Sequence, residues 1–248
     1  MDTYYNLKKY SELDLSDNTQ KIGLFINYQA SSHIRILSNL CLLNNQEYTP
    51  YIINMSEQDK CRKDLENDLF FLDIVIVERN VLDDDFTNLL IEKCKLLDIK
   101  LIYELDDDLI NIDLSHPQYE KYSKASKTIV RIAENADELV VSTNYLKDKL
   151  SIYNDNITVI PNTLTEAWDK ETTFQPKDSN LIKIGYMGTT THKNDLKLVE
   201  EAIINVKEYF KNSNQEVVFE IIGGSDEDLK YAQEISIPHD KIDYPNFV

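Results

Sequence analysis

Glycine is scarce in this chain, which has five glycines among 248 residues. The first strongly apolar run, KIGLFIN at residues 21–27, contains Gly23 alone, and the polar turn YQASSH follows it. A dinucleotide-binding fold needs a glycine-rich turn directly after its first strand, because the backbone must approach the pyrophosphate closely there. The sequence therefore argues against a conventional NAD site.

Cysteine is also rare, and its spacing excludes the usual cysteine chemistry. Cys41, Cys61 and Cys94 form neither a CxxC pair nor a Cys/His cluster with the spacing of metal ligands. Apolar helical surroundings such as SNLCLL and IEKCKLL are typical of small core residues. We expect reduced intracellular thiols with no catalytic role, and no metal site.

Basic residues are too few to balance the acidic ones. Lysine and arginine number 26 against 44 aspartate and glutamate residues, which gives a formal net charge of −18. Such a field repels nucleic acids and anionic lipid surfaces, so nucleic acid is not an expected partner. Cellular salt screens charges beyond about 8–10 Å, and a local basic pocket could still bind an anionic nucleotide.

Long apolar runs are missing as well. The N-terminal stretch MDTYYNLKKYSELDLSDNTQ lacks the continuous apolar core of a signal peptide. No segment approaches the roughly 20 apolar residues of a membrane span. We expect a cytoplasmic protein, and we leave open a peripheral association with the inner face of the membrane. The oligomeric state cannot be read from these patterns.

What the sequence does contain is a regular alternation of strands and helices. Apolar runs at residues 21–27, 48–54, 73–78, 100–105, 138–142 and 157–160 predict strands, with helical periodicity between most of them. A further strand at 182–187, a helix to residue 210, a strand at 217–222 and a helix over 228–235 are expected next. This alternation predicts an α/β fold with a Rossmann-like parallel sheet covered by helices.

Three carboxylates, Asp106, Asp107 and Asp108, follow the strand KLIYEL directly. Parallel sheets bind ligands at the carboxyl ends of their strands, so this position is suggestive. Carboxylates this close could position a hydroxyl group, accept a proton or recruit a cation. The alternative is a set of solvated carboxylates, one of which caps the turn that follows.

A second candidate site follows the strand IKIGYM. A strand, a glycine turn and a helix N-terminus together favour the binding of an anion such as phosphate. The alternative is an ordinary strand-to-helix turn with a solvated lysine. The candidate ligands are Gly188, Thr189, Thr190, His192 and Lys193, and the glycines that follow the strand VVFEII, Gly223 and Gly224, form a companion site.

A third candidate segment begins the helix after the first strand. It carries Ser31, Ser32, His33 and Arg35, which could contact a ligand at the same edge of the sheet. Capping of the helix by a serine, with a surface arginine, is the structural alternative.

The order VIPN, polar linker, IGYMGTTTHKNDL, amphipathic helix and VVFEIIGG resembles the domain crossing of GT-B glycosyltransferases, and ELDDD and YPNFV resemble a bacterial polysaccharide-type branch. The resemblance implies two Rossmann-like domains. Residues 1–168 would form the acceptor-side domain, residues 169–180 a linker and residues 181–248 the first part of a truncated donor domain. Many members of the family carry an arginine after the first glycine of the donor loop, where this chain has Thr189 and Thr190.

The resemblance further implies transfer of a sugar from a nucleoside-diphosphate sugar to a glycan or lipid-linked acceptor, in bacterial surface glycan synthesis and without a required metal. It assigns catalysis to Asp106–Asp108, the nucleotide to the glycine–threonine–lysine loop, and the acceptor to the Ser31–Arg35 segment. One alternative is a fragment that binds a nucleotide or an acceptor without turnover. The other is a haloacid-dehalogenase-like phosphatase, in which Asp106 attacks phosphorus and Mg²⁺ bridges Asp106 and Asp108.

Overall fold

The computed structural model describes residues 7–9, 12, 14, 16, 18–27, 30–40, 47–54, 71–116, 118–163, 180–188, 193–222 and 233–235, with the side chains at 9, 54, 193, 194, 222 and 233–235 left out. The chain divides into two compact units. The first comprises Met1–Ser115 and Tyr119–Asp169, and the second comprises His116–Gln118 and Lys170–Val248. Each unit is described separately below.

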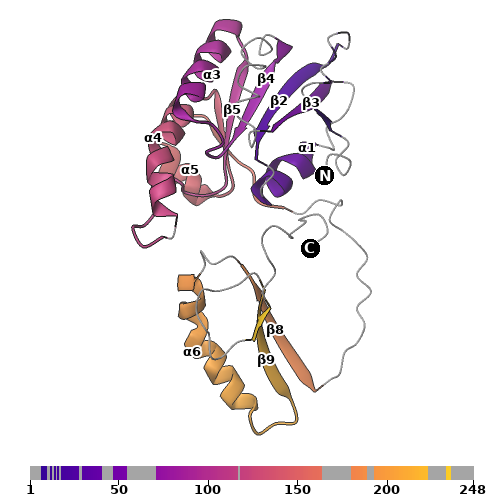
Figure 1. The fold of residues 1–248 in the computed structure, drawn as a ribbon, viewed down its shortest axis with the longest axis vertical. Helices are drawn as coiled ribbons and strands as arrows, with labels where there is room; N and C mark the ends of the chain where they lie inside the picture. The colour runs from indigo at the N-terminus through magenta and orange to yellow at the C-terminus, as the bar shows by residue number, and fades with distance from the viewer. Residues whose placement is uncertain are drawn as a thin grey trace. The chain divides into compact units, whose positions relative to one another are not determined.

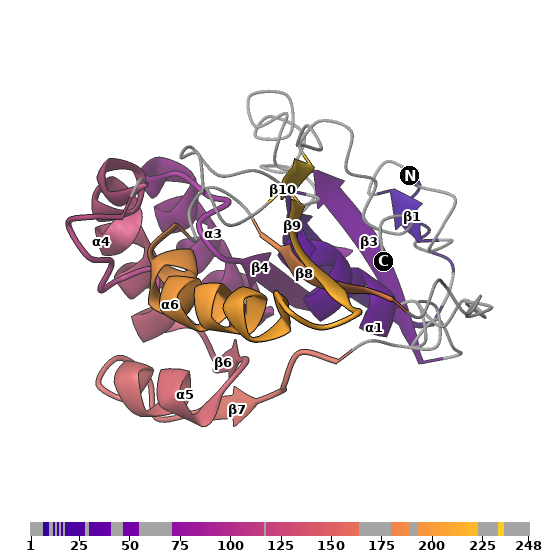
Figure 2. The ribbon, with the colours of Figure 1, turned by 90° about the horizontal axis from the view of Figure 1, so that it is seen from below.

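A seven-stranded sheet forms the centre of the first unit (Figures 1 and 2). Its strand order is β1-β3-β2-β4-β5-β6-β7, and every neighbouring pair is parallel. This finding confirms the predicted Rossmann-like α/β fold. The strands are β1 (Lys8–Lys9), β2 (Gln20–Ile26), β3 (Tyr48–Asn54), β4 (Ile74–Glu78), β5 (Lys100–Leu105), β6 (Glu138–Val141) and β7 (Ile157–Val159).

The direction of the strand order reverses beside β2. The chain passes from β2 to β3 on one side, and then returns to β4 on the other side of β2. At such a switch point the loops after neighbouring strands diverge and leave a crevice at the carboxyl edge. Side chains that end β2, β4 and β5 are therefore the ones best placed to form a site.

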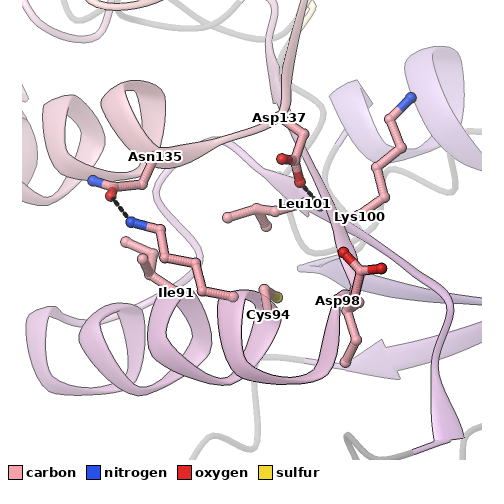
Figure 3. Close-up of a pocket in the computed structure, with 9 residues that line it drawn as sticks. Ile91, Cys94, Asp98, Lys100, Leu101, Asn135 and Asp137 are labelled. Carbon is pink, nitrogen blue, oxygen red and sulfur yellow. Dashed lines mark hydrogen bonds between the residues drawn. The ribbon is translucent and has the colours of Figure 1, made fainter.

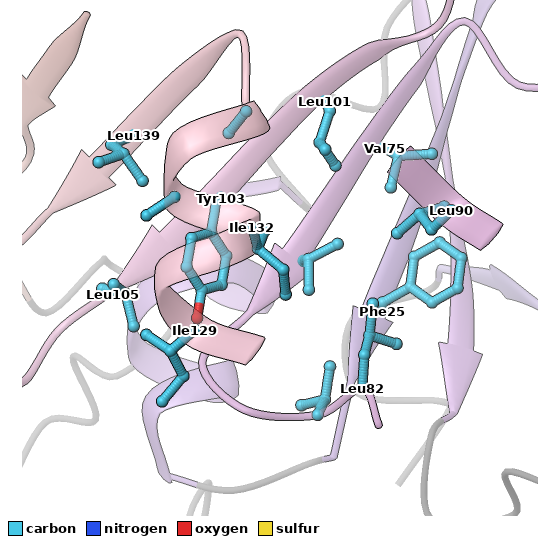
Figure 4. Close-up of a cluster of buried hydrophobic side chains, with 14 of the residues drawn as sticks. Phe25, Val75, Leu82, Leu90, Leu101, Tyr103, Leu105, Ile129, Ile132 and Leu139 are labelled. Carbon is cyan, nitrogen blue, oxygen red and sulfur yellow. The ribbon is translucent and has the colours of Figure 1, made fainter. Parts of the chain in front are cut away.

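One face of this sheet is covered by three helices, α3 (Asp84–Leu97), α4 (Tyr119–Asn135) and α5 (Asn144–Leu150). Figure 4 shows the core between the sheet and these helices, where Phe25, Leu90, Tyr103 and Ile129 lie among aliphatic side chains. Each side chain buried in this way contributes about 1.5–3 kcal/mol to stability. This hydrophobic core thus supports the strands whose carboxyl ends form the edge of the sheet.

Part of the opposite face, at β2 and its neighbours, is covered by a short helical segment, residues 30–40, that follows β2. It comprises the π-helix η2 (Ser32–Leu37) and α1 (Ser38–Leu40). Ile36, Leu37 and Leu40 pack there against Leu24 and other residues of β2 and β3. The predicted helix is confirmed, but its winding was not anticipated.

Gly23 allows a close approach inside β2. A Cβ atom at this position would lie 2.7 Å from Cδ1 of Leu72 and 3.2 Å from Cδ1 of Ile53. Gly23→Ala is therefore expected to cost about 1–2 kcal/mol of unfolding free energy, because buried Leu72 must repack. Urea denaturation tests this, with Gly185→Ala as the control, since within the described residues, apart from its chain neighbours, no atom lies within 4 Å of a Cβ added there. Equal effects of the two substitutions would contradict the expectation.

The second unit contains a three-stranded parallel sheet with the order β10-β9-β8. The strands are β8 (Leu181–Met187), β9 (Glu216–Ile222) and β10 (Gln233–Ile235), and helix α6 (Lys193–Phe210) connects β8 to β9. Leu196 and Ile203 of α6 pack on Phe219 and Ile221. This strand–helix–strand arrangement agrees with the pattern read from the sequence, while a partial second Rossmann-like domain remains a prediction.

One expected element is wrong at its end. Residues 233–235 of the helix predicted over 228–235 form β10 instead, which pairs in parallel with Glu220, Ile221 and Ile222 of β9, and residues 228–232 lie outside the described residues. Pairing with a neighbouring strand overrides local helical preference in so short a segment.

None of the helices within the described residues has the length and apolarity needed to cross a membrane.

Candidate functional site

The carboxyl ends of β4 and β5 carry a pair of buried acids. Glu78 ends β4, and the parallel register places it beside Glu104 of β5. Because side chains alternate between the faces of a sheet, both carboxylates lie on the face of Ile74 and Ile76. Glu78 is 1% exposed and Glu104 is 3% exposed. Two acids held side by side in this way need nearby donors and cations.

Two serines that follow β2 supply donors to Glu78. Ser31 Oγ donates to one carboxylate oxygen and Ser32 Oγ to the other, each at 2.5 Å. Both serines belong to the helical segment whose π-type turns are marked by the Ser38 N–H bonding to His33 O, five residues back. π-Helical turns are rare and often occur at functional sites.

Arg35 supplies a cation to Glu104. Its Nε donates to Glu104 Oε1 at 2.6 Å, and its Nη1 donates to the carbonyl of Ile160 and, at 3.0 Å, to Asn162 Oδ1. The other oxygen of Glu104, Oε2, is buried without a hydrogen-bond partner within the described part of the chain. This oxygen is the atom of Glu104 that can hold a proton without breaking the bond to Arg35.

Arg79 organises the next part of the edge, directly after β4. Its Nη1 donates to Asp106 Oδ1 at 2.6 Å and to Asp107 Oδ2 at 2.8 Å. Its backbone has φ of 46°, and Tyr103 Oη donates to its carbonyl at 2.8 Å. Left-handed backbone costs a non-glycine residue about 1–2 kcal/mol, and such strain concentrates at functional sites. The surrounding contacts therefore fix Arg79 in an unusual conformation.

The three consecutive aspartates have different environments. Asp106 is paired with Arg79, and both side chains are 13% exposed, whereas the side chain of Asp107 is 62% exposed. Asp108 Oδ1 accepts the N–H groups of Ile110 and Asn111 at 3.3 and 3.0 Å. Asp108 thus stabilises the following turn, as the structural alternative predicted. Because Asp106 is paired and Asp108 serves the turn, the geometry argues against the phosphatase alternative.

The pKa values of the three acids at this edge are raised. Burial raises the pKa of Glu78, although the bonds from Ser31 and Ser32 oppose the change. Burial raises the pKa of Glu104 to about 8 against the effect of Arg35, and it raises that of Asp106 against the effect of Arg79. The raised pKa of Glu104 lies near neutral pH, in the range that suits acid–base chemistry.

We call this set of side chains the edge cluster: Ser31, Ser32, Arg35, Glu78, Arg79, Glu104 and Asp106. It includes one aspartate from the predicted catalytic run and three residues of the predicted acceptor segment. His33, the fourth residue of that segment, is 1% exposed. The hydroxyls and the guanidinium of the segment bond to protein acids, so contact with an acceptor stays a prediction.

The predicted donor loop is described only at its borders. Gly188 follows β8, where an added Cβ would lie 2.6 Å from Tyr186 Oη, so a larger residue would require the Tyr186 side chain to move. Helix α6 begins at Lys193, whose side chain is not described. Thr189, Thr190, His192, Gly223 and Gly224 lie outside the described residues.

A hollow of about 510 Å³ lies at the opposite, amino edge of the sheet (Figure 3). Its polar lining is engaged in structural bonds, since Lys95 Nζ donates to Asn135 Oδ1 and the Leu101 N–H donates to Asp137 Oδ2. Burial raises the pKa of the Cys94 thiol to about 12, so Cys94 is a poor nucleophile. We therefore assign the chemistry to the carboxyl edge and not to this hollow.

Among the side chains that the structure describes, no group of histidine, cysteine and acidic residues is arranged to hold a metal ion. Sequence reasoning missed Glu78, Arg79 and Glu104 as site residues. Their signal was a charged residue at the end of an otherwise apolar strand, in DIVIVER and KLIYEL.

No protein-family model matches the chain, and no curated protein matches it in sequence.

Proposed function

We propose that this chain transfers a sugar from a nucleoside-diphosphate sugar to an acceptor, as a glycosyltransferase or part of one, in bacterial surface glycan synthesis. The edge cluster is the observation that carries the proposal. Its acids and arginines come from β4, β5, the turn after each, and η2, at the edge where parallel α/β sheets bind ligands. Carboxylate and guanidinium groups also suit the recognition of sugar hydroxyls.

Sugar transfer to a hydroxyl group requires a base for its proton. Asp106 is the partly exposed acid of the cluster, and Arg79 holds its carboxylate in place. Its pKa is raised by burial, which makes it a stronger base than an ordinary aspartate. We assign Asp106 the contact with the acceptor hydroxyl, with Arg79 as its positioning residue.

The donor would bind in the second unit. Strand β8 ends just before Gly188, and the 18-residue helix α6 offers backbone N–H groups at its N-terminus, where an anion is stabilised by about 0.3–1 kcal/mol or more. Lys193, the first residue of α6, would add a positive charge beside the diphosphate. The nucleoside-diphosphate leaving group needs this stabilisation as its charge develops.

Calorimetric titration of the 248-residue chain with UDP, GDP, CDP and dTDP, with and without Mg²⁺, tests the donor site. One base is expected to bind without the metal, and Lys193→Ala should weaken that binding by about 10- to 100-fold, because a charge-assisted contact to phosphate is lost. Lys197→Ala, one turn further along α6, is the matched control and should bind as the wild type does. Failure of every nucleotide to bind would contradict the donor assignment.

Release of nucleoside diphosphate from the matching sugar nucleotide tests the role of Asp106. Asp106→Asn is expected to lower turnover about 100- to 10,000-fold while nucleotide affinity is unchanged, because only the proton acceptor is lost. Nucleotide binding without any turnover in the wild type would favour the non-catalytic binding fragment. Hydrolysis of p-nitrophenyl phosphate that Asp106→Asn abolishes would instead support a phosphatase.

A further inference from the structure

Arg35 joins parts of the first unit that are far apart in the sequence. It lies in η2, and its side chain is 3% exposed. Its partners, Glu104, Ile160 and Asn162, are 69, 125 and 127 residues away along the chain. A single buried guanidinium thus connects η2, the carboxyl end of β5 and residues 160–162, which we call the exit segment because they follow the last strand of the unit.

The exit segment itself is largely at the surface. Ile160 is 45% exposed, and Asn162 is also exposed. Pro161 has no N–H group to donate, so it cannot extend the ladder of β7. The Ile160 N–H donates to Val141 O at 2.8 Å, and the Arg35 guanidinium approaches from the interior to bind the carbonyl of the same residue. One residue is therefore held from two directions.

The planar guanidinium suits this task. It offers five N–H donors in a fixed fork, and Arg35 uses Nε for the carboxylate of β5 and Nη1 for the two oxygens of the exit segment. Burial and the nearby carboxylates of Asp106 and Glu78 raise the pKa of Glu104, whereas Arg35 lowers it. The Arg35 guanidinium is held in the interior by its bonds to Glu104 and to the two oxygens of the exit segment.

We propose that Arg35 is a positioning residue that clamps the exit segment to the edge cluster through Glu104. The clamp makes the order of residues 160–162 depend on the same buried acids that form the site. It does not depend on sugar transfer, because every contact lies within the first unit of the protein itself.

Amide hydrogen exchange of Ile160, followed by NMR on the whole chain, tests the clamp. Arg35→Ala is expected to speed exchange of this amide about 10- to 100-fold. In the wild type the buried Arg35 contacts must break before Ile160 can open, and the variant lacks these contacts. Asn162→Ala, which removes one acceptor at the surface, should speed it by a few-fold. Arg131→Ala removes an exposed ion pair to Asp84 and should leave the rate at Ile160 unchanged.

Chemical rescue separates the clamp from general loosening of the fold. Methylguanidinium added to Arg35→Ala should restore slow exchange at Ile160, since it replaces the missing donors in the space that they occupied. If Arg35→Ala does not fold, Asn162→Ala decides the matter alone. An unchanged exchange rate in folded Arg35→Ala, or in Asn162→Ala when Arg35→Ala is unfolded, overturns the proposal.

Discussion

Glu104→Gln is expected to flatten the dependence of folding stability on pH. Burial raises the pKa of Glu104 from about 4.5 to about 8. Between these two pH values the folded protein binds more protons than the unfolded chain. The contribution of protonated Glu104 to folding stability is therefore fully present below pH 4.5 and is lost as the pH rises through 8. The loss for the wild type should reach about 4 kcal/mol between pH 5 and pH 9.

Urea denaturation at a series of pH values measures this effect. Glutamine resembles the protonated acid, so the variant should match the wild type near pH 5 and exceed it at pH 9. Burial also raises the pKa values of Glu78 and Asp106. Because of these two acids, the stability of Glu104→Gln should still fall with pH, but less steeply than that of the wild type. Glu138→Gln is the control, because hydrogen bonds from Lys100 and Thr158 lower the pKa of Glu138. A wild-type stability that rises from pH 5 to pH 9 would contradict the burial of these acids.

Arg79→Met is expected to lower the free energy of unfolding by about 3–5 kcal/mol at neutral pH. Removing one partner of a buried ion pair leaves the other charge uncompensated, and here the uncompensated group is Asp106. Lysine at this position should recover part of the loss, since an ammonium group is a point charge and cannot reproduce the planar fork.

Chemical denaturation of Arg79→Met, Arg79→Lys and Asp107→Asn tests this expectation. The side chain of Asp107 is 62% exposed, so its pairing with the same guanidinium contributes little, and Asp107→Asn should change stability by less than about 1 kcal/mol. A loss in Arg79→Met no larger than that in Asp107→Asn would show that Asp106 has enough solvent to remain charged alone.

The architecture of the first unit could be predicted from the sequence because its strands are short apolar runs. Val75 and Val77 face one layer of the core while Ile74 and Ile76 pack against the other, so β4 is apolar on both faces. Such runs separated by amphipathic helices specify parallel pairing. The strand β10 lacked this signal, since its pairing with β9 depends on a contact distant in sequence.

The candidate site could be predicted only in part. The run Asp106–Asp108 pointed to the carboxyl edge of the sheet, but its pattern did not distinguish the three aspartates from one another. Their separate environments arise because Arg79, from the preceding strand end, selects Asp106 and Asp107, while Asp108 bonds to the local turn. The pairing of Glu78 with Glu104 likewise depends on strand register, which is a property of the assembled sheet.

The same reason explains why the segment after β2 was misjudged in detail. Ser31, Ser32 and Arg35 were expected to face a ligand from the start of a helix. The π-helical winding of η2 and the acids on β4 and β5 turn these side chains into the interior. Helical periodicity alone carries no information on acids that lie tens of residues away.

Chemical-shift mapping tests the central claim that the carboxyl edge of the first unit binds the acceptor. Amide spectra of the whole chain would be recorded during titration with neutral oligosaccharides and with sugar nucleotides. We predict shifts at the amides of residues 78–80, 104–108, 160 and 162, with little change at residues 94–101 and 135–137 around the amino-edge hollow. Shifts confined to the hollow, or none in the first unit at saturating ligand, would contradict the account.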